Sequence, residues 1–224
     1  IPLMLAGYNP VLVSLSVAGV ILALVLFGTH GFNPSSCSAF IGTFSAVLVT
    51  SVVALFFVSA LALSGFGSDA SVYLNFATDG QLDFAGLLLG SIIIGILGVL
   101  DDVAITQASV VQELKLANSK LNIQELYNRA LRVGRDHVGS LVNTLALAYV
   151  GAALPLVLLF STSEAPLGLT LNQEVIAAEI ARIIIGSIGL ILAVPFTTFI
   201  AAWWFGTHGV DEGSVSSHSH HHHH

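Results

Sequence analysis

The chain has 224 residues, of which only 6 are Lys or Arg and 13 are Asp or Glu. Charged residues make up 8% and hydrophobic residues 55%, whereas a soluble domain carries about 25% charged residues. This composition excludes a water-soluble globule and indicates an integral membrane protein, and a net charge of −7 with so few basic residues argues against nucleic acid as a partner.

Five stretches are long and apolar enough to cross a bilayer, which takes about 20 residues. They are residues 11–28, 39–64, 84–112, 138–160 and 175–205. The sequence therefore predicts an all-α fold, a polytopic transmembrane helical bundle with five spans. We expect a single transmembrane domain over residues 1–206, followed by a C-terminal tail, 207–224, that ends in a histidine tag.

The basic residues predict how the bundle is oriented. Five of the six lie in the link between the third and fourth spans: Lys115, Lys120, Arg129, Arg132 and Arg135. Loops rich in Lys and Arg stay on the cytoplasmic side of the membrane. With five spans, this places the N-terminus outside and the C-terminus in the cytoplasm.

Residues 121–137 of the same link show the apolar spacing of one helical stripe. Asn122 and Glu125 have the spacing of a capping box. The pattern predicts an amphipathic cytoplasmic helix between spans three and four, lying on the headgroups. A role as a lever between the two spans is the alternative interpretation.

Asp101 and Asp102 are the residues of this sequence most clearly suited to a chemical role. They lie inside the third apolar stretch, near the middle of the membrane. Each carboxyl there costs about 2.5–3.5 kcal/mol on insertion scales, and such a cost usually indicates a function. Two adjacent carboxyls in a low dielectric are not expected to be ionised together. The alternative is a structural role, in which the pair caps or pins neighbouring helices.

The third span divides into two faces on a helical wheel. One face has small and polar residues together with the carboxylates, and the other is strongly apolar. We expect the small face to pack against neighbouring helices, as membrane helix interfaces require, and the apolar face to meet lipid. The small face includes Ser91, Gly95, Gly98, Thr106 and Ser109, and the apolar face Leu89, Ile92, Ile93, Ile96, Val99, Leu100 and Val103.

Four further polar residues are candidate proton-relay groups or ion ligands for Asp101 and Asp102. Thr106 follows them in the third span, and the fourth span contributes Ser140, Asn143 and Thr144. Their oxygens could relay a proton or complete a Na⁺ site. Ordinary hydrogen bonding between helices is the favoured alternative for Asn143 and Thr144.

The remaining reactive residue types predict neither a metal centre nor a cofactor. Cys37 is the only cysteine, so a disulfide framework is excluded, and six of the nine His lie in the terminal tag. No phosphate-binding loop, zinc-ligand spacing or nucleophile elbow is present. Glu179 and Arg182 near the outer end of the fifth span are predicted to form an interfacial ion pair, in preference to a substrate site. We therefore expect no catalytic residues and no cofactor beyond H⁺ or Na⁺ as a coupling ion.

Three segments carry a resemblance to a known family. Residues 95–107, 125–138 and 141–156 resemble the YibE/F family of bacterial membrane proteins, and Gly31-Phe32-Asn33 fits its earlier part. The resemblance implies a multi-pass protein of the bacterial inner membrane but no substrate. Members of that family commonly have an additional N-terminal span and an extracytoplasmic segment, so the resemblance also implies that this chain is a fragment of a longer protein.

A more distant similarity concerns the order of the elements. An acidic span, a basic amphipathic link and a Thr-containing span ending in Leu-Pro-Leu are similar to one half of the resistance–nodulation–division transporters, with the SecD/SecF subunits as the nearest comparison. In those proteins carboxylates in the fourth span of a six-span unit take part in proton coupling. The similarity implies that Asp101 or Asp102 is the coupling residue, and it is one of fold level only.

These observations favour a proton- or cation-coupled transporter or permease module, with the lipid bilayer and either a second copy or a second membrane subunit as partners. The alternative is a non-transporting structural or assembly subunit, in which the carboxylates only dock another membrane protein. An intramembrane aspartyl hydrolase is disfavoured, because that chemistry needs carboxylates facing each other from different helices. We therefore expect no enzyme activity.

Overall fold

The computed structural model describes residues 7–67, 69–162 and 166–209, and all regular secondary structure in these ranges is α-helical. The predicted histidine tag lies outside the described residues. The helices are α2 (Pro10–His30), α3 (Pro34–Ala60), α4 (Asp69–Ala77), α5 (Phe84–Ala117), α6 (Ile123–Ala152), α7 (Leu154–Ser161), α8 (Leu167–Leu171) and α9 (Glu174–His208).

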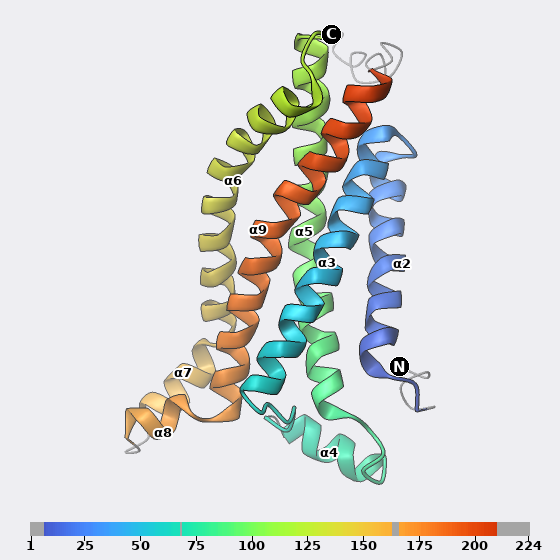
Figure 1. Ribbon diagram of the computed structural model, residues 1–224. Helices are drawn as coiled ribbons and strands as arrows, with labels where there is room; N and C mark the ends of the chain where they lie inside the picture. Colours follow the sequence, from blue (N-terminus) through green and yellow to red (C-terminus); the bar gives the residue numbers. More distant parts are fainter. Residues whose placement is uncertain (1–6, 68, 163–165, 210–224) are drawn as a thin grey trace, which may run out of the picture.

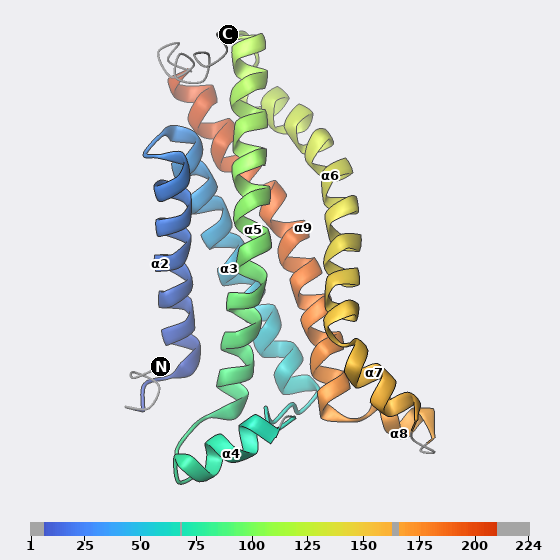
Figure 2. The ribbon, with the colours of Figure 1, turned by 180° about the vertical axis from the view of Figure 1, so that it is seen from behind.

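The long helices run side by side along one direction (Figure 1). Helix α9 packs against α3, α5 and α6, and α5 also packs against α2 and α3. In the view from behind, α5 lies in front, between α2 and α6 (Figure 2). The short helices α4, α7 and α8 gather at the end of the bundle where the N-terminus lies, and α9 ends at the opposite end. We call these the α4 end and the C-terminal end.

Four of the described helices are long and apolar enough to cross a membrane: α2, α3, α5 and α9. Helices α6 and α7 make a fifth span if they are taken together, although they meet at a bend of 55°. The protein is therefore a multi-pass, all-helical membrane protein, in agreement with the predicted fold class. Its orientation in the membrane stays a prediction.

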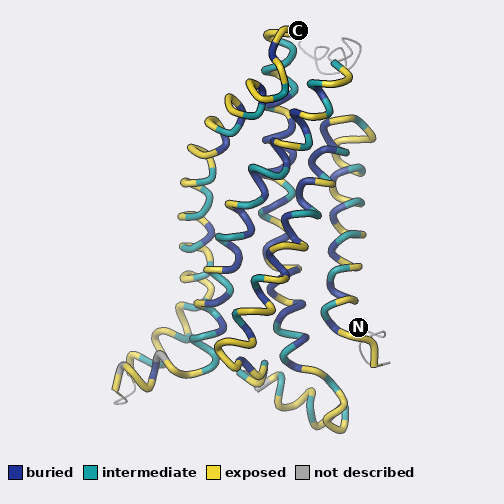
Figure 3. Tube along the Cα trace, in the orientation of Figure 1, coloured by how far each residue is buried: buried dark blue, intermediate teal, exposed yellow. Residues whose placement is uncertain are grey.

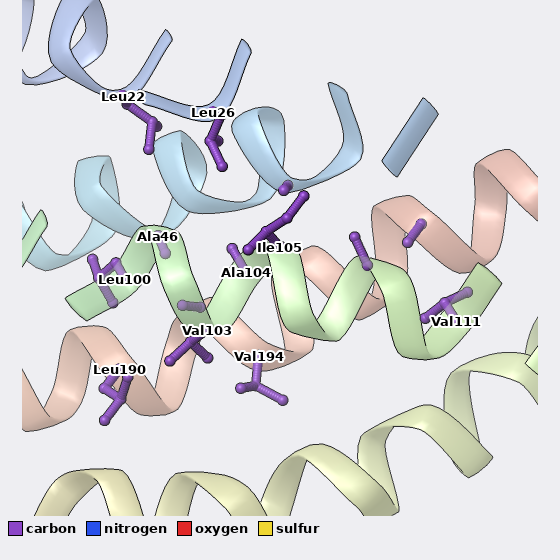
Figure 4. Packing of buried hydrophobic residues seen from close by; sticks show 14 of the residues in the cluster. Leu22, Leu26, Ala46, Leu100, Val103, Ala104, Ile105, Val111, Leu190 and Val194 are labelled. Atoms are coloured by element: carbon purple, nitrogen blue, oxygen red, sulfur yellow. The ribbon is translucent and has the colours of Figure 1, made fainter. Parts of the chain in front are cut away.

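The core of the bundle is formed where α2, α3, α5 and α9 meet. Its centre is lined by aliphatic side chains that interlock across the four helices (Figure 4): Leu22, Leu26, Ala46, Leu100, Val103, Ala104, Leu190 and Val194. Small residues bring the backbones close together, as at Gly42 of α3, where an added Cβ would lie 2.6 Å from the Cα of Thr197 in α9. The α2–α5 contact is built in the same way, with Ser14 packed on Gly90. Membrane helices associate through such close packing.

Helix α6 differs from its predicted boundaries. Residues 121–137 and 138–160 were expected to form a surface helix and a separate span, but residues 123–152 form one continuous helix. The predicted capping box is confirmed at its start: the Glu125 N–H donates to Asn122 Oδ1 at 2.9 Å, and the Asn122 N–H donates to Glu125 Oε2 at 3.1 Å. The helix ends before Pro155, whose ring and missing N–H interrupt the hydrogen-bond ladder, and α7 continues at an angle.

Two short helices, α4 and α8, lie between the long apolar stretches. Both are at the α4 end of the bundle (Figure 1). Helix α4 lies across the ends of the long helices rather than parallel to them (Figure 2). These helices form part of the surface at that end, where most residues of α4 are exposed or half-buried (Figure 3).

Candidate functional site

Helix α5 positions the two carboxylates. It is 34 residues long, begins with Asp83, whose Oδ1 accepts the Gly86 N–H at 2.9 Å, and ends at Asn118. Asp101 and Asp102 lie at the midpoint of this helix, where α5 is in contact with α2, α3 and α9. The site therefore lies on a long helix that packs into the bundle and not on a loop.

The two faces of α5 are buried and exposed in the opposite way to the prediction. The apolar residues expected to meet lipid are packed inside the bundle: Leu89, Ile92, Ile93, Ile96, Leu100 and Val103 have between 0% and 4% of their surface exposed. Six small or polar residues are exposed instead, and we call them the polar face of α5: Ser91, Gly95, Gly98, Asp102, Thr106 and Ser109.

The prediction that the small face packs against the other helices of the chain was thus wrong. The reason is physical: lipid tails are as apolar as Leu, so hydrophobicity alone does not decide which side of a membrane helix faces its neighbours. Here the aliphatic side of α5 interlocks with α2, α3 and α9. The polar face is left on the surface of a single copy.

The two carboxylates have different environments. Asp102 is exposed on the polar face, whereas Asp101 is half-buried. Asp101 Oδ1 accepts the backbone N–H of Asp102 at 2.9 Å. Within the described part of the chain neither carboxylate forms an ion pair, because Glu179–Arg182 is the ion pair found there. No ion pair with a cation of the described residues therefore holds either group in its charged form.

The candidate relay residues are exposed, but in the described ranges they form no hydrogen bond with the carboxylates. Thr106 follows Asp102 by one helical turn on the polar face. Ser140, Asn143 and Thr144 are exposed on α6, and the Thr144 hydroxyl donates to the Ser140 carbonyl at 3.1 Å. In the ranges that the structure describes, no hydrogen bond joins these four residues to either Asp. Their proposed role as relay groups or ion ligands stays a prediction.

One polar side chain near the site was not predicted to take part in it. Gln107 is only 4% exposed. Its Nε2 donates to the Ala130 carbonyl of α6 at 2.9 Å and to Thr198 Oγ1 of α9 at 2.8 Å, so it joins three helices. An isolated Gln on the apolar side of the helical wheel is the sequence signal that indicates such an interhelical bond.

No cluster of three or more His, Cys, Asp or Glu side chains that could hold a metal ion occurs in the described ranges. The site offers a pair of carboxyls, one of them exposed, in a part of α5 where the preceding turns carry small and aliphatic side chains. A carboxyl in such a place can bind and release a proton or a monovalent cation.

Comparison with known proteins supports the predicted family. The family model described as "YibE/F-like protein" matches residues 1–207, which is most of the chain. The chain belongs to the YibE/F-like family. No curated protein matches this YibE/F-like chain, and no solved structure matches it either.

The family match extends over nearly the whole helical bundle. The match covers α2 to α9 almost completely, so that all the membrane-spanning helices of this YibE/F-like protein, and Asp101 and Asp102 with them, lie inside the family region. The similarity to resistance–nodulation–division transporters stays a prediction.

Proposed function

We propose that this YibE/F-like protein is a proton- or Na⁺-coupled transport module of the bacterial inner membrane, and that Asp102, assisted by Asp101, binds the coupling ion. The observation that supports the proposal is the exposed Asp102 in the middle of a membrane-spanning helix, without a cationic partner in the described residues. A carboxylate left there permanently charged is costly, and reversible neutralisation removes that cost.

The proposed module works as a pair of identical chains that meet along the polar face of α5. Members of the face recur every three or four residues from Ser91 to Ser109, a length of about 27 Å at 1.5 Å per residue. This nearly spans the hydrocarbon. A stripe of small residues permits close approach of two helices, and a two-fold axis would bring the two Asp102 residues toward each other. A second copy thus covers the carboxylate that one copy exposes.

Ion coupling is tested in proteoliposomes to which an acid pulse is applied. The substrate is unidentified, so the probe is a small-molecule extract of bacterial cytoplasm, collected as a dialysate. Internal pH is followed with a trapped pH-sensitive dye, and we expect acidification that depends on both protein and extract. A parallel series with a Na⁺ gradient and a trapped Na⁺-sensitive dye identifies the ion. Ion entry no greater than in protein-free vesicles in both series would contradict coupled transport and favour the assembly-subunit alternative.

Pairing through α5 is tested by cysteine cross-linking in membranes. Cys37 is the only cysteine and is replaced by Ser. Gly98→Cys adds a thiol to the polar face, where a new Cβ meets no atom within 4 Å. We expect a disulfide-linked dimer on mild oxidation, because two Cys can bond when their Cα atoms approach within about 7 Å.

The matched control for this experiment is Gly28→Cys. Gly28 is exposed, and its added Cβ also meets no atom within 4 Å. It lies about 9 Å nearer the C-terminal end than Gly98. Helix α2 runs parallel to α5, and Gly28 is as far beyond Ser14 as Ala104 is beyond Gly90, the residue on which Ser14 packs. Cross-linking at Gly28 as strong as at Gly98 would rule out a dimer specific to α5.

A further inference from the structure

A cavity of about 350 Å³ lies at the α4 end of the bundle, between α4, α5 and α9. This volume is within the range of small-molecule sites. Its walls combine apolar and charged side chains from elements that are distant in the sequence. Leu74 and Phe84 supply part of the apolar wall, and Glu174, Glu179 and Arg182 supply the charges.

The charges of this cavity are not balanced. Arg182 Nη1 donates to Glu179 Oε1 at 2.9 Å, and this confirms the predicted ion pair. Glu174 has only neutral partners, the Ser64 hydroxyl and the Gly65 N–H, each at 2.6 Å. Since no cation of the described residues pairs with it, Glu174 leaves the cavity with one negative charge in excess. A bound cationic group would neutralise it.

The guanidinium of Arg182 has a hydrogen-bond donor without an acceptor. Its Nε is buried and has no hydrogen-bond partner, although the side chain as a whole is 25% exposed. A buried donor without an acceptor is costly. Nε itself is not accessible from the cavity, but a ligand carboxylate beside the exposed part of the guanidinium would form a charge-assisted bond with Arg182. The cavity therefore contains a cation, Arg182, that can bind an acceptor, and a carboxylate, Glu174, that can bind a cation.

The separation of these two groups sets the size of the ligand. Glu174 and Arg182 are eight residues apart on α9, which places their Cα atoms about 12 Å apart along the axis. Side chains on a helix lean toward its N-terminus, so the Arg182 side chain reaches back toward Glu174. An extended dipeptide is about 7 Å long, and the Arg182 side chain spans the rest.

We propose that this cavity binds a zwitterion of dipeptide size with apolar side chains. The ammonium group pairs with Glu174, the carboxylate pairs with Arg182, and the side chains contact Leu74, Phe84 and Val175. Ser91 lines the cavity and also begins the polar face of α5 that leads to Asp102. Its use as the substrate site of a transporter rests on the proposed function, but the binding itself does not.

Binding is tested with the purified protein in detergent, in the absence of any ion gradient, by titration calorimetry. The probe is L-leucyl-L-leucine. The N-acetylated dipeptide lacks the ammonium group, the dipeptide amide lacks the carboxylate, and free L-leucine is too short to reach both ends. We expect saturable binding of the dipeptide and at least about tenfold weaker binding of the other three, since each loses one charged contact. No heat of binding with the dipeptide, or equal affinity for the capped forms, would overturn the proposal.

Substitutions of the charged residues test whether the dipeptide binds in this cavity. Glu174→Gln and the charge-balanced Glu179→Gln/Arg182→Gln are expected to weaken dipeptide binding at least about tenfold. Glu113→Gln, which removes an exposed carboxylate near the far end of α5, should bind like the wild type. Unchanged affinity in both cavity variants would overturn the assignment. The capped peptides test the same charges on wild-type protein, so the test stands even where a variant does not fold.

Failure of this proposal and failure of the proposed function are distinguishable. Calorimetry without a membrane reports only the cavity. The acid-pulse experiment reports only ion coupling, with an extract and not with the dipeptide as its probe. Binding without extract-driven ion flux would leave a ligand site in a non-transporting protein, and flux without dipeptide binding would place the substrate elsewhere.

Discussion

Asp102→Asn is expected to reduce extract-dependent ion flux to the level of protein-free vesicles. Asn is nearly the same size as Asp but does not take up and release a proton or carry a charge, so a coupling ion has no site. Asp102 is the carboxylate that lies open on the polar face of α5. The flux assay in proteoliposomes measures the effect, and a symmetric gel-filtration profile shows that the variant folds.

Asp101→Asn should have a smaller effect than Asp102→Asn. The amide oxygen of Asn can still accept the Asp102 N–H that Asp101 Oδ1 accepts now, so the local geometry is kept. Asp136→Asn is the control, because Asp136 is an exposed carboxylate of α6 outside the polar face, and we expect wild-type flux. Wild-type flux in Asp102→Asn and also in the Asp101→Asn/Asp102→Asn double variant would show that the ion is bound elsewhere.

Gly42→Leu is expected to cost about 3 kcal/mol of stability or more, the upper range for overpacked sites. Helices α3 and α9 approach each other here so closely that even a single Cβ would lie 2.6 Å from the backbone of Thr197. Neither helix can move away alone, because both also pack against α5. A large fall in Tm, followed by the fluorescence of Trp203 and Trp204, or failure to purify a monodisperse protein, is the predicted result.

Gly28→Leu serves as the matched substitution. It places the same side chain on an apolar helix at a position where nothing lies within 4 Å of the new Cβ. We expect a Tm equal to or slightly above that of the wild type, because Leu is the better helix former by about 0.8–1 kcal/mol. A similar loss of stability in both variants would mean that the effect is one of hydrophobicity and not of the α3–α9 contact.

Local features of the fold follow from residues that act on their immediate neighbours. The capping box at Asn122 fixes the start of α6, and Pro155 fixes its end, because each acts on backbone groups within one helical turn. The continuity of α6 through residue 138 was not predicted. A change from an amphipathic to an apolar pattern indicates a change of surroundings along the helix, and nothing in it requires the helix to stop.

The sequence by itself determined that this is a multi-pass helical protein with two carboxylates deep in its third apolar stretch, because length, charge and hydropathy report directly on transfer into a bilayer. Only the tertiary structure decided which side of α5 is packed and which is open. It also decided that Gln107 joins three helices and that Glu174 and Arg182 share a cavity. Lipid tails are as apolar as the side chains that face them, so hydrophobicity does not decide which face of a membrane helix is buried, and the fit between the side chains of neighbouring helices does.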